Sequence, residues 1–387
     1  MDILVNAIPL SGLQTGIGRT LRCLYQAVEK LSFGPLPLCI SYFDGWRVRR
    51  DMPKAADPKQ WQTRTDAVWK LPDLVVLGRR ILRQVQVEWR LRRVCRQASY
   101  DIYHEASFFP AAQHRVPTVF SLFDFSLDRF AHTHPRERVW FYRLFFARRL
   151  RYASHIVTIS HAVLNEARAR LRVADNRLTA VPLAPDPIFS QRSSEEVAAV
   201  RRRFGLDGDY WLFVGSLEPR KNLRLFWDAL RRLGASAPMV LAGWHGWGDK
   251  SWLREAVERG GSRTPRCVLT GFVDDATLAA LYSGATALVY PSLYEGFGLP
   301  VLEAMACGCP VVCSNIAALR ETAGDAALFI EPHDPDGLAA VLDDLLSHGR
   351  RRKEYRQRGF ERARQFSWEK TARAMVDVFQ KVVEKNA

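Results

Sequence analysis

The chain has 387 residues, of which 48% are hydrophobic and 25% are charged, and its formal net charge is +15. The composition is that of a soluble globular protein, and the length suggests two domains with ample hydrophobic core. The sequence contains no apolar run of about 18 residues, so we expect no membrane-spanning helix.

The positive charge is concentrated in the first half of the chain. Residues 1–190 contain 29 Lys and Arg against 16 Asp and Glu, whereas residues 191–387 contain 27 against 25. Such an excess suits an anionic partner, either a membrane surface or a nucleic acid. Because no nucleic-acid-binding motif accompanies the charge, we rank nucleic acid last and expect none.

The N-terminus and the cysteines favour a cytoplasmic protein. Residues Met1–Asn6 include an acid and no basic segment, which predicts a first buried strand rather than a signal peptide. The seven cysteines are scattered, and we interpret Cys307, Cys309 and Cys313 as small buried hydrophobic residues rather than metal ligands. The basic first half leaves open a peripheral position at the inner face of the cell membrane.

Apolar strands alternate with helical segments in the first half, which predicts a doubly wound parallel sheet. Residues 53–72, rich in Lys, Asp and Trp, are predicted to form an irregular loop. We predict strands at residues 2–8, 35–42, 102–104, 117–123, 156–160 and 179–182, and helices at residues 19–31, 74–96, 135–153 and 161–171.

The helix predicted over residues 74–96 has two interpretations. Ile81, Val85 and Trp89 recur at helical spacing among many arginines. The helix either lies on anionic lipid, where each basic side chain contributes about 1 kcal/mol, or packs on its own domain through these three residues. The residues leave both open. A second basic stretch follows at residues 136–151.

A proline-rich segment, Pro182–Ser190, predicts the domain boundary because its three prolines break both helix and sheet. We therefore assign a first domain to residues 1–187 and a second to residues 188–365. The second alternation has predicted strands at residues 210–214, 239–242, 266–269, 287–290 and 311–313, and helices at residues 223–233, 252–258, 274–283, 300–307 and 334–346.

Two carboxylates eight residues apart, Glu295 and Glu303, bracket a turn that contains Gly296 and Gly298. Pro300 opens the following helix, and the backbone N–H groups of the turn and of the helix start make an anion site. A ligand with its diphosphate at the helix N-terminus would meet one carboxylate on each side. Carboxylates accept hydrogen bonds from hydroxyls, which a nucleotide-sugar has on both ribose and sugar. For Glu303 alone, a favourable interaction with the helix dipole is the simpler interpretation.

The segment Glu295–Glu303 resembles the Glu-x7-Glu motif of retaining glycosyltransferases of family 4. This family has the GT-B fold, an α/β fold of two facing Rossmann-like domains with a cleft between them. The resemblance also implies that a C-terminal helix over residues 366–387 returns to the first domain. Further matching blocks follow the family's order at Thr15–Arg19, Val214–Leu223, Ala304–Asn315, Glu321–Ala327 and Phe366–Trp368.

The resemblance implies a donor site in the second domain. Glu295 would approach the hydroxyls of the donor sugar and Glu303 those of the ribose. Arg220 and Lys221 would contact the diphosphate, where negative charge builds as the glycosidic bond breaks. Many family members have Arg directly after the strand glycine, where this chain has Ser216. The other implied donor-site residues are Phe297, Gly298 and Leu299, through backbone N–H groups, and Phe272 and Val273 after Gly271, beside the base.

The first domain would contribute the loop Gly12–Arg19, in which Gly16, and then Gly18, would contact the donor phosphates. The family often has His-Asp after a central strand, but this chain has Phe123-Asp124. Asp124 would orient the acceptor or Arg129; its alternative role is to cap Ser126 or the following segment. His104 and His161 are further candidates for polar contact, although a lone His is more often structural.

The resemblance implies transfer of a sugar from a nucleoside diphosphate donor with retention, by a front-face mechanism that needs no enzyme nucleophile. The donor sugar is open, with mannose from GDP-mannose as one candidate, and the acceptor is a glycan or lipid-linked oligosaccharide of surface polysaccharide synthesis. We expect no cofactor and no metal, and interpret Asp207-Gly-Asp209 as a turn. A GT-B sugar-nucleotide epimerase, or a weakly catalytic binding scaffold suggested by Phe123 and Ser216, are the alternatives.

Overall fold

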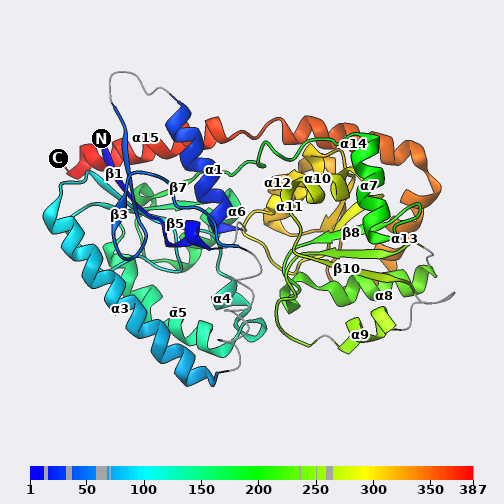
Figure 1. The fold of residues 1–387 in the computed structure, drawn as a ribbon, viewed down its shortest axis with the longest axis horizontal. Helices are drawn as coiled ribbons and strands as arrows, with labels where there is room; N and C mark the ends of the chain where they lie inside the picture. Colours follow the sequence, from blue (N-terminus) through cyan, green and yellow to red (C-terminus); the bar gives the residue numbers. More distant parts are fainter. Residues whose placement is uncertain are drawn as a thin grey trace. The chain divides into compact units, whose positions relative to one another are not determined.

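The protein is described by a computed structural model that covers residues 1–12, 16–31, 37–57, 68, 71–234, 237–249, 251–258 and 265–386. It divides into two compact units (Figure 1). The first unit comprises Met1–Leu183 and Trp368–Ala387, and the second comprises Ala184–Ser367. The borders predicted from the sequence lie within a few residues of these divisions.

The first unit contains a seven-stranded sheet in the order β3-β2-β1-β4-β5-β6-β7. All neighbours are parallel except β2 and β3. The chain order reverses at the pair β1 and β4. The strands are β1 (Asp2–Asn6), β2 (Cys39–Phe43), β3 (Val48–Arg49), β4 (Ile102–Glu105), β5 (Thr118–Leu122), β6 (His155–Thr158) and β7 (Leu178–Ala180).

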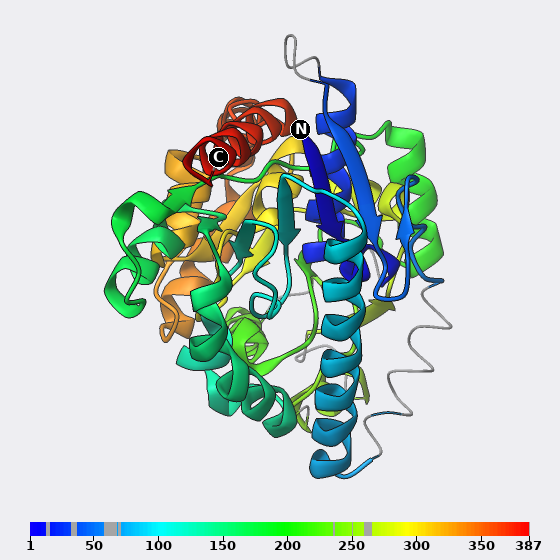
Figure 2. The same ribbon diagram turned by 90° about the vertical axis from the view of Figure 1, so that its left-hand side faces the viewer.

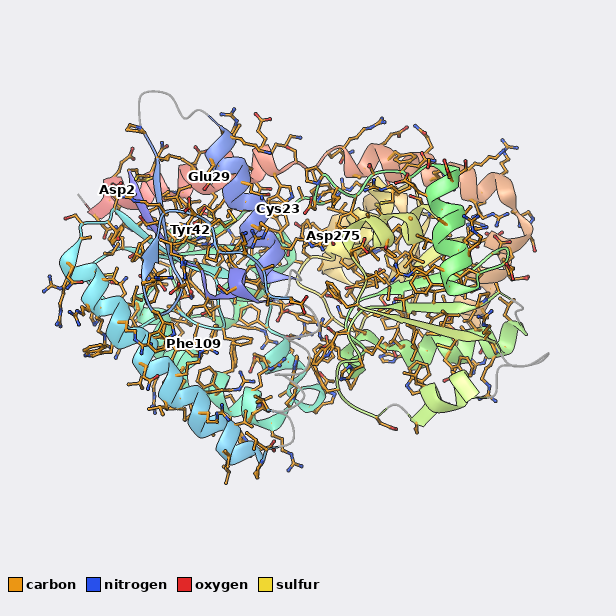
Figure 3. All side chains as sticks on the ribbon, in the orientation of Figure 1. Asp2, Cys23, Glu29, Tyr42, Phe109 and Asp275 are labelled. Carbon is orange, nitrogen blue, oxygen red and sulfur yellow. The ribbon has the colours of Figure 1, made fainter. Side chains whose placement is uncertain are left out.

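Helices pack on this sheet through their apolar faces. Tyr25 of α1 packs edge-on against Tyr42 of β2. The Tyr42 hydroxyl donates to Glu29, also of α1, at 2.9 Å (Figure 3). Phe109 stacks on Phe145 of α5. The main helices of the first unit are α1 (Ile17–Lys30), α3 (Asp73–Gln97), α4 (Ser126–Arg129), α5 (Arg136–Arg149), α6 (His161–Arg170) and α15 (Trp368–Asn386), with short 3-10 turns at η1 (Ile8–Ser11), η2 (Ala131–Thr133), η3 (Leu150–Tyr152) and η4 (Asp175–Arg177).

The C-terminal helix α15 belongs to the first unit, although the second unit precedes it in the chain. The Thr371 hydroxyl donates to the Pro182 carbonyl at 2.7 Å, and the fully buried Phe379 lies 5.5 Å from the His104 ring. The strand predicted over residues 2–8 ends at Asn6, because Ile8–Ser11 forms a 3-10 helix that contains Pro9.

The second unit contains a six-stranded, wholly parallel sheet in the order β10-β9-β8-β11-β12-β13. Its chain order reverses between β8 and β11. The strands are β8 (Trp211–Val214), β9 (Met239–Ala242), β10 (Cys267–Gly271), β11 (Ala287–Tyr290), β12 (Val311–Ser314) and β13 (Leu328–Ile330). The helices are α7 (Ser194–Phe204), η5 (Pro219–Lys221), α8 (Leu223–Leu233), α9 (Ser251–Glu258), α10 (Asp275–Gly284), α11 (Leu299–Ala306), α12 (Ala317–Ala323), η6 (Gly324–Ala326), α13 (Pro335–Ser347) and α14 (Gly349–Ala363).

The helix α3 presents its apolar outer side chains to solvent. Figure 1 and Figure 2 show it as a long helix along the first unit. Its inner side packs through Val76, Leu91 and Cys95, whereas Val85 is 55% and Trp89 is 61% exposed. Ile81 is half-buried, so the interpretation in which Ile81, Val85 and Trp89 pack on their own domain is wrong for Val85 and Trp89.

The cysteines are thiols. Cys307, Cys309 and Cys313 are buried, as predicted; Cys23, Cys95 and Cys267 are also buried, and Cys39 is half-buried. Among the residues that the structure covers, no helix combines the length and the apolar character needed to cross a bilayer.

Candidate active site

Two loops at the carboxyl edge of the second sheet bring charged side chains together. Arg220 and Lys221 lie in the loop after β8, and Glu295 lies in the loop after β11. These two strands are neighbours at the point where the chain order reverses. Doubly wound sheets bind ligands at such points, beyond the carboxyl ends of the strands. The fold therefore assembles this part of the predicted donor site within one unit.

Lys221 and Glu295 form the centre of this cluster. The ammonium Nζ of Lys221 donates to Glu295 Oε1 at 2.6 Å and to the Tyr290 hydroxyl at 2.8 Å. The side chains of Lys221 and Glu295 are only 9% and 10% exposed. A nearly buried ammonium at a strand end can stabilise a negatively charged group strongly, because little water screens it.

The electrostatics of the cluster keep Glu295 ionised. Burial by itself would raise the pKa of Glu295, but the positive charges of Lys221 and Arg220 outweigh burial and hold this pKa at about 2. At neutral pH Glu295 is therefore a carboxylate that accepts hydrogen bonds, as contact with sugar hydroxyls requires.

Arg220 links the two loops. Its Nη1 donates to the Tyr294 carbonyl and its Nη2 to Glu218 Oε1, each at 2.5 Å. Its own carbonyl accepts from the Leu293 N–H at 2.9 Å, and its guanidinium lies 3.4 Å from Glu295 Oε2. Through these contacts Arg220 holds the two loops together next to Lys221. The contact of Arg220 with a diphosphate stays a prediction.

Glu303 lies on α11 and is buried, with Oε2 accepting from the Tyr282 hydroxyl of α10 at 3.1 Å. Leu299 begins α11 and Gly298 precedes it with φ +103°. A Cβ at Gly298 would lie 2.5 Å from Leu319 Cδ2, so this position requires glycine. The Phe297 carbonyl accepts from the Thr322 hydroxyl at 2.7 Å, which fixes the approach to the helix.

The remaining donor-site candidates of the second unit follow β8 and β10. Ser216 is half-buried in the same loop as Lys221. Phe272 is half-buried and Val273 is buried after β10, which lies two strands away from β8 in the sheet. Asp209, of the Asp-x-Asp sequence, contacts the Thr286 hydroxyl and Arg352, each at 2.9 Å, which accords with a structural turn.

The site residues predicted in the first unit lie at helix starts or make local contacts. Gly16 is exposed at the N-cap of α1, and Gly18 is buried in its first turn; residues 13–15 of this loop lie outside the described residues. Asp124 Oδ1 accepts from the Ser126 N–H at 2.7 Å, as its capping interpretation expects. Arg129 pairs with Glu166 at 3.2 Å.

His104 is a core histidine. Its Nδ1 shares a hydrogen bond of 2.6 Å with the Tyr25 hydroxyl, and its Nε2 shares one of 2.8 Å with Ser121. Burial lowers the pKa of His104 to about 3, so the ring is neutral. His161 is exposed at the start of α6.

Two polar residues that the sequence analysis missed meet where the chain order of the first sheet reverses. Asn6 ends β1 and donates to Glu105 Oε1, at the end of β4, at 2.5 Å. The Tyr103 hydroxyl donates to Glu105 Oε2 at 2.8 Å. Burial raises the pKa of Glu105 to about 7. Asn6 and Glu105 are each a polar residue at the end of a strand, and this pattern is the sequence signal that could have found them.

Comparison with known families and structures agrees with this arrangement. A family model described as Glycosyltransferase Family 4 matches residues 51–187, and one described as Glycosyl transferases group 1 matches residues 208–348. The sucrose-phosphate synthase of Thermosynechococcus elongatus superposes with a TM-score of 0.74 at 17% identity over 99% of both chains. HepE of Anabaena, solved with UDP and glucose, superposes with a TM-score of 0.70 at 18% identity over 98% of this chain and 100% of its own.

A full-length relative has a defined activity. The O-antigen chain mannosyltransferase B of Escherichia coli is 32% identical over 390 residues, which cover 98% of this chain and 100% of the relative. The two parallel-sheet units are those of the GT-B fold. The chain belongs to glycosyltransferase family 4, the glycosyl transferases group 1.

Proposed function

We propose that this glycosyltransferase moves mannose from GDP-mannose to a lipid-linked glycan of a surface polysaccharide, with retention of the anomeric configuration. The mannosyl donor is supported by the full-length similarity to the O-antigen chain mannosyltransferase of Escherichia coli. The observation that carries the chemistry is the buried pair of Lys221 and Glu295, 2.6 Å apart, where the second sheet reverses its order.

Each member of this pair has a separate task in the proposed reaction. The bond between the anomeric carbon and the diphosphate oxygen breaks, and the acceptor oxygen bonds to that carbon on the same face. The acceptor proton passes to the departing diphosphate oxygen. Lys221 stabilises the negative charge of that leaving group, and Glu295 holds the sugar hydroxyls in position. No enzyme nucleophile and no metal ion take part.

The first experiment measures the thermal stability of the protein with GDP, UDP, ADP and dTDP, each with and without EDTA. We expect GDP to raise the melting temperature most, and equally in EDTA. A rise that EDTA abolishes would contradict the metal-independent site, and a larger rise with UDP would contradict the GDP donor. Conversion of free GDP-mannose without acceptor would instead favour an epimerase, and no stabilisation by any nucleotide would favour a scaffold.

We also propose that the first unit binds an anionic membrane surface peripherally. The outer side of α3 exposes Leu82, Val85 and Trp89 among exposed arginines. The neighbouring α5 exposes Trp140 and Leu144 between Arg136 and Arg148, which are also exposed. Apolar and aromatic side chains surrounded by positive charge fit the boundary between headgroups and acyl chains. Such contact would place the enzyme beside a lipid-linked acceptor.

A further inference from the structure

The loop after β9 lies directly against the loop that contains Lys221. We call residues Gly243–Gly248, with the sequence Gly-Trp-His-Gly-Trp-Gly, the bracing loop. The Leu217 N–H donates to the Trp244 carbonyl at 3.0 Å, and the Gly215 N–H donates to Ala242 at 2.9 Å. The bracing loop thus continues the sheet pairing of β8 and β9 beyond the ends of both strands.

Three glycines make this approach possible. A Cβ at Gly243, where φ is +140°, would collide with the Gly215 carbonyl, and a Cβ at Gly246, where φ is +56°, would collide with the Leu217 carbonyl. At Gly248, where φ is +96°, a Cβ would lie 2.5 Å from Pro219 Cγ. Pro219 opens the turn η5, which ends at Lys221. The contact is therefore made by glycine backbone and leaves no room for side chains.

We propose that the bracing loop is a positioning element that holds the turn Pro219–Lys221 in place, so that the Lys221 ammonium faces Glu295 before the donor binds. Arg220 holds the same turn from the other side through the Tyr294 carbonyl. The ring pair of Trp244 and Trp247, 6.1 Å apart, stiffens the bracing loop. The inference rests on the proposed donor site and adds the source of its rigidity.

The test uses the full-length protein and a matched pair of glycines. Gly248→Ala forces a methyl group against Pro219, whereas Gly208→Ala, at φ +86° with nothing within 4 Å, carries similar backbone strain without a collision. We expect Gly248→Ala, relative to Gly208→Ala, to weaken GDP binding about tenfold and to lower donor kcat/KM by up to about a hundredfold, with acceptor KM unchanged.

A rescue variant separates positioning from general loss of stability. Pro219→Ala removes the ring atoms with which the new methyl group collides, since Pro219 Cβ is 3.9 Å away. In the double variant, Gly248→Ala should therefore cost much less GDP affinity than it costs alone. Gly246→Ala, compared with Gly234→Ala in open space at φ +62°, provides a second pair for the same measurement.

The outcomes separate the two hypotheses. If the unmodified protein binds no nucleoside diphosphate, the proposed function fails. If it binds one, and Gly248→Ala and Gly246→Ala bind it as tightly as their control variants, the bracing loop has no positioning task. Equal loss in the single and double variants would also overturn the proposal.

Discussion

Glu295 and Glu303 have different surroundings, although both are acids of the same motif. Glu295 pairs with Lys221 and Arg220 beside the turn, whereas Glu303 accepts from the Tyr282 hydroxyl inside the unit. Their proposed partners, the sugar hydroxyls and the ribose hydroxyls, differ accordingly. The two positions should therefore respond differently to the same isosteric change.

Glu303→Gln should weaken GDP binding by roughly ten- to a hundredfold, because hydrogen bonds to a charged acceptor contribute about 1.5–3 kcal/mol. Glu295→Gln should leave GDP affinity within about threefold and lower kcat for mannosyl transfer by about a hundredfold or more. Calorimetric titration with GDP and steady-state transfer assays provide the comparison. The opposite pattern would reverse the two assignments.

Glu105 predicts a pH dependence of stability in the first unit. Burial raises its pKa from 4.5 to about 7, so the folded protein binds this proton more tightly than the unfolded chain. The resulting stabilisation is fully present below pH 4.5 and is lost as the pH rises to about 7, a change of about 3 kcal/mol. The Glu105→Gln variant has no titrating group at this position. Between pH 4.5 and 7.5 its unfolding free energy should therefore rise by this amount relative to that of the unmodified protein. A difference that is constant with pH in urea unfolding would contradict the prediction.

At the scale of elements, α3 buries a charged side chain on its inner side and exposes large apolar ones on its outer side. Its inner side carries two ion pairs to α5: Arg80 with Glu137 at 3.2 Å, and Glu88 with Arg149 at 2.9 Å. Both acids are at most 5% exposed, whereas Leu82, Val85 and Trp89 are each more than half exposed. The sequence spacing alone left open whether Val85 and Trp89 face lipid or pack on their own domain.

Reversing the charge at the exposed Arg79, Arg83 and Arg93 by substitution with Glu should release the protein from anionic vesicles, since each lost cation costs about 1 kcal/mol. Arg80 is left unchanged because its replacement by Glu would face Glu137. Substitution of the exposed Arg350, Lys353 and Arg364 of the second unit by Glu is the control, with the same change in net charge. Vesicle sedimentation that treats both triple variants alike would argue against a surface on α3.

At the scale of the whole molecule, the chain leaves the first unit after Leu183 and returns to it at Trp368. The final helix completes the core of the first unit rather than extending the second. Phe379, which is fully buried beside His104, belongs to this core. Truncation of this side chain should therefore affect one unit and spare the other.

Phe379→Ala should destabilise the first unit by about 3–5 kcal/mol, because it leaves a cavity in a packed core. GDP affinity, for which we assign most of the contacts to the second unit, should stay within about threefold at temperatures below the transition. Glu384→Ala, at an exposed position of the same helix, is the control. Hydrogen exchange would locate the effect, and faster exchange confined to the strands of the second unit would contradict it.

Local patterns predicted the sheets well. The strands Met239–Ala242 and Ala287–Tyr290 were predicted at their observed limits, because short apolar runs end at turn residues there. Helix α7 was missed although Ser193 and Glu196 form a capping box and Gly205 ends the helix at φ +60°. This helix has few large apolar residues, so its periodicity is weak and its caps were the better signal.

The features that the sequence did not predict arise from contacts between segments that are distant in the chain. The motif around Glu295 was readable because its residues are close in sequence. The bond between Asn6 and Glu105 joins residues 99 positions apart, and the need for glycine at Gly246 arises only from the nearby Leu217 carbonyl. Local spacing predicts neither the exposure of the Trp89 side chain nor the hydrogen bonds by which Arg220 connects two loops. Both depend on neighbours that are distant in the sequence.

The distribution of the thiols allows the opening of each unit to be measured by chemical labelling of the unmodified protein. Cys23, Cys39 and Cys95 belong to the first unit, and Cys267, Cys307, Cys309 and Cys313 belong to the second. A thiol reagent should label the half-buried Cys39 in the native protein and reach the six buried positions only through opening of the structure. Mass spectrometry of alkylated peptides would then time the opening of each unit separately, in one unmodified sample, with or without nucleotide.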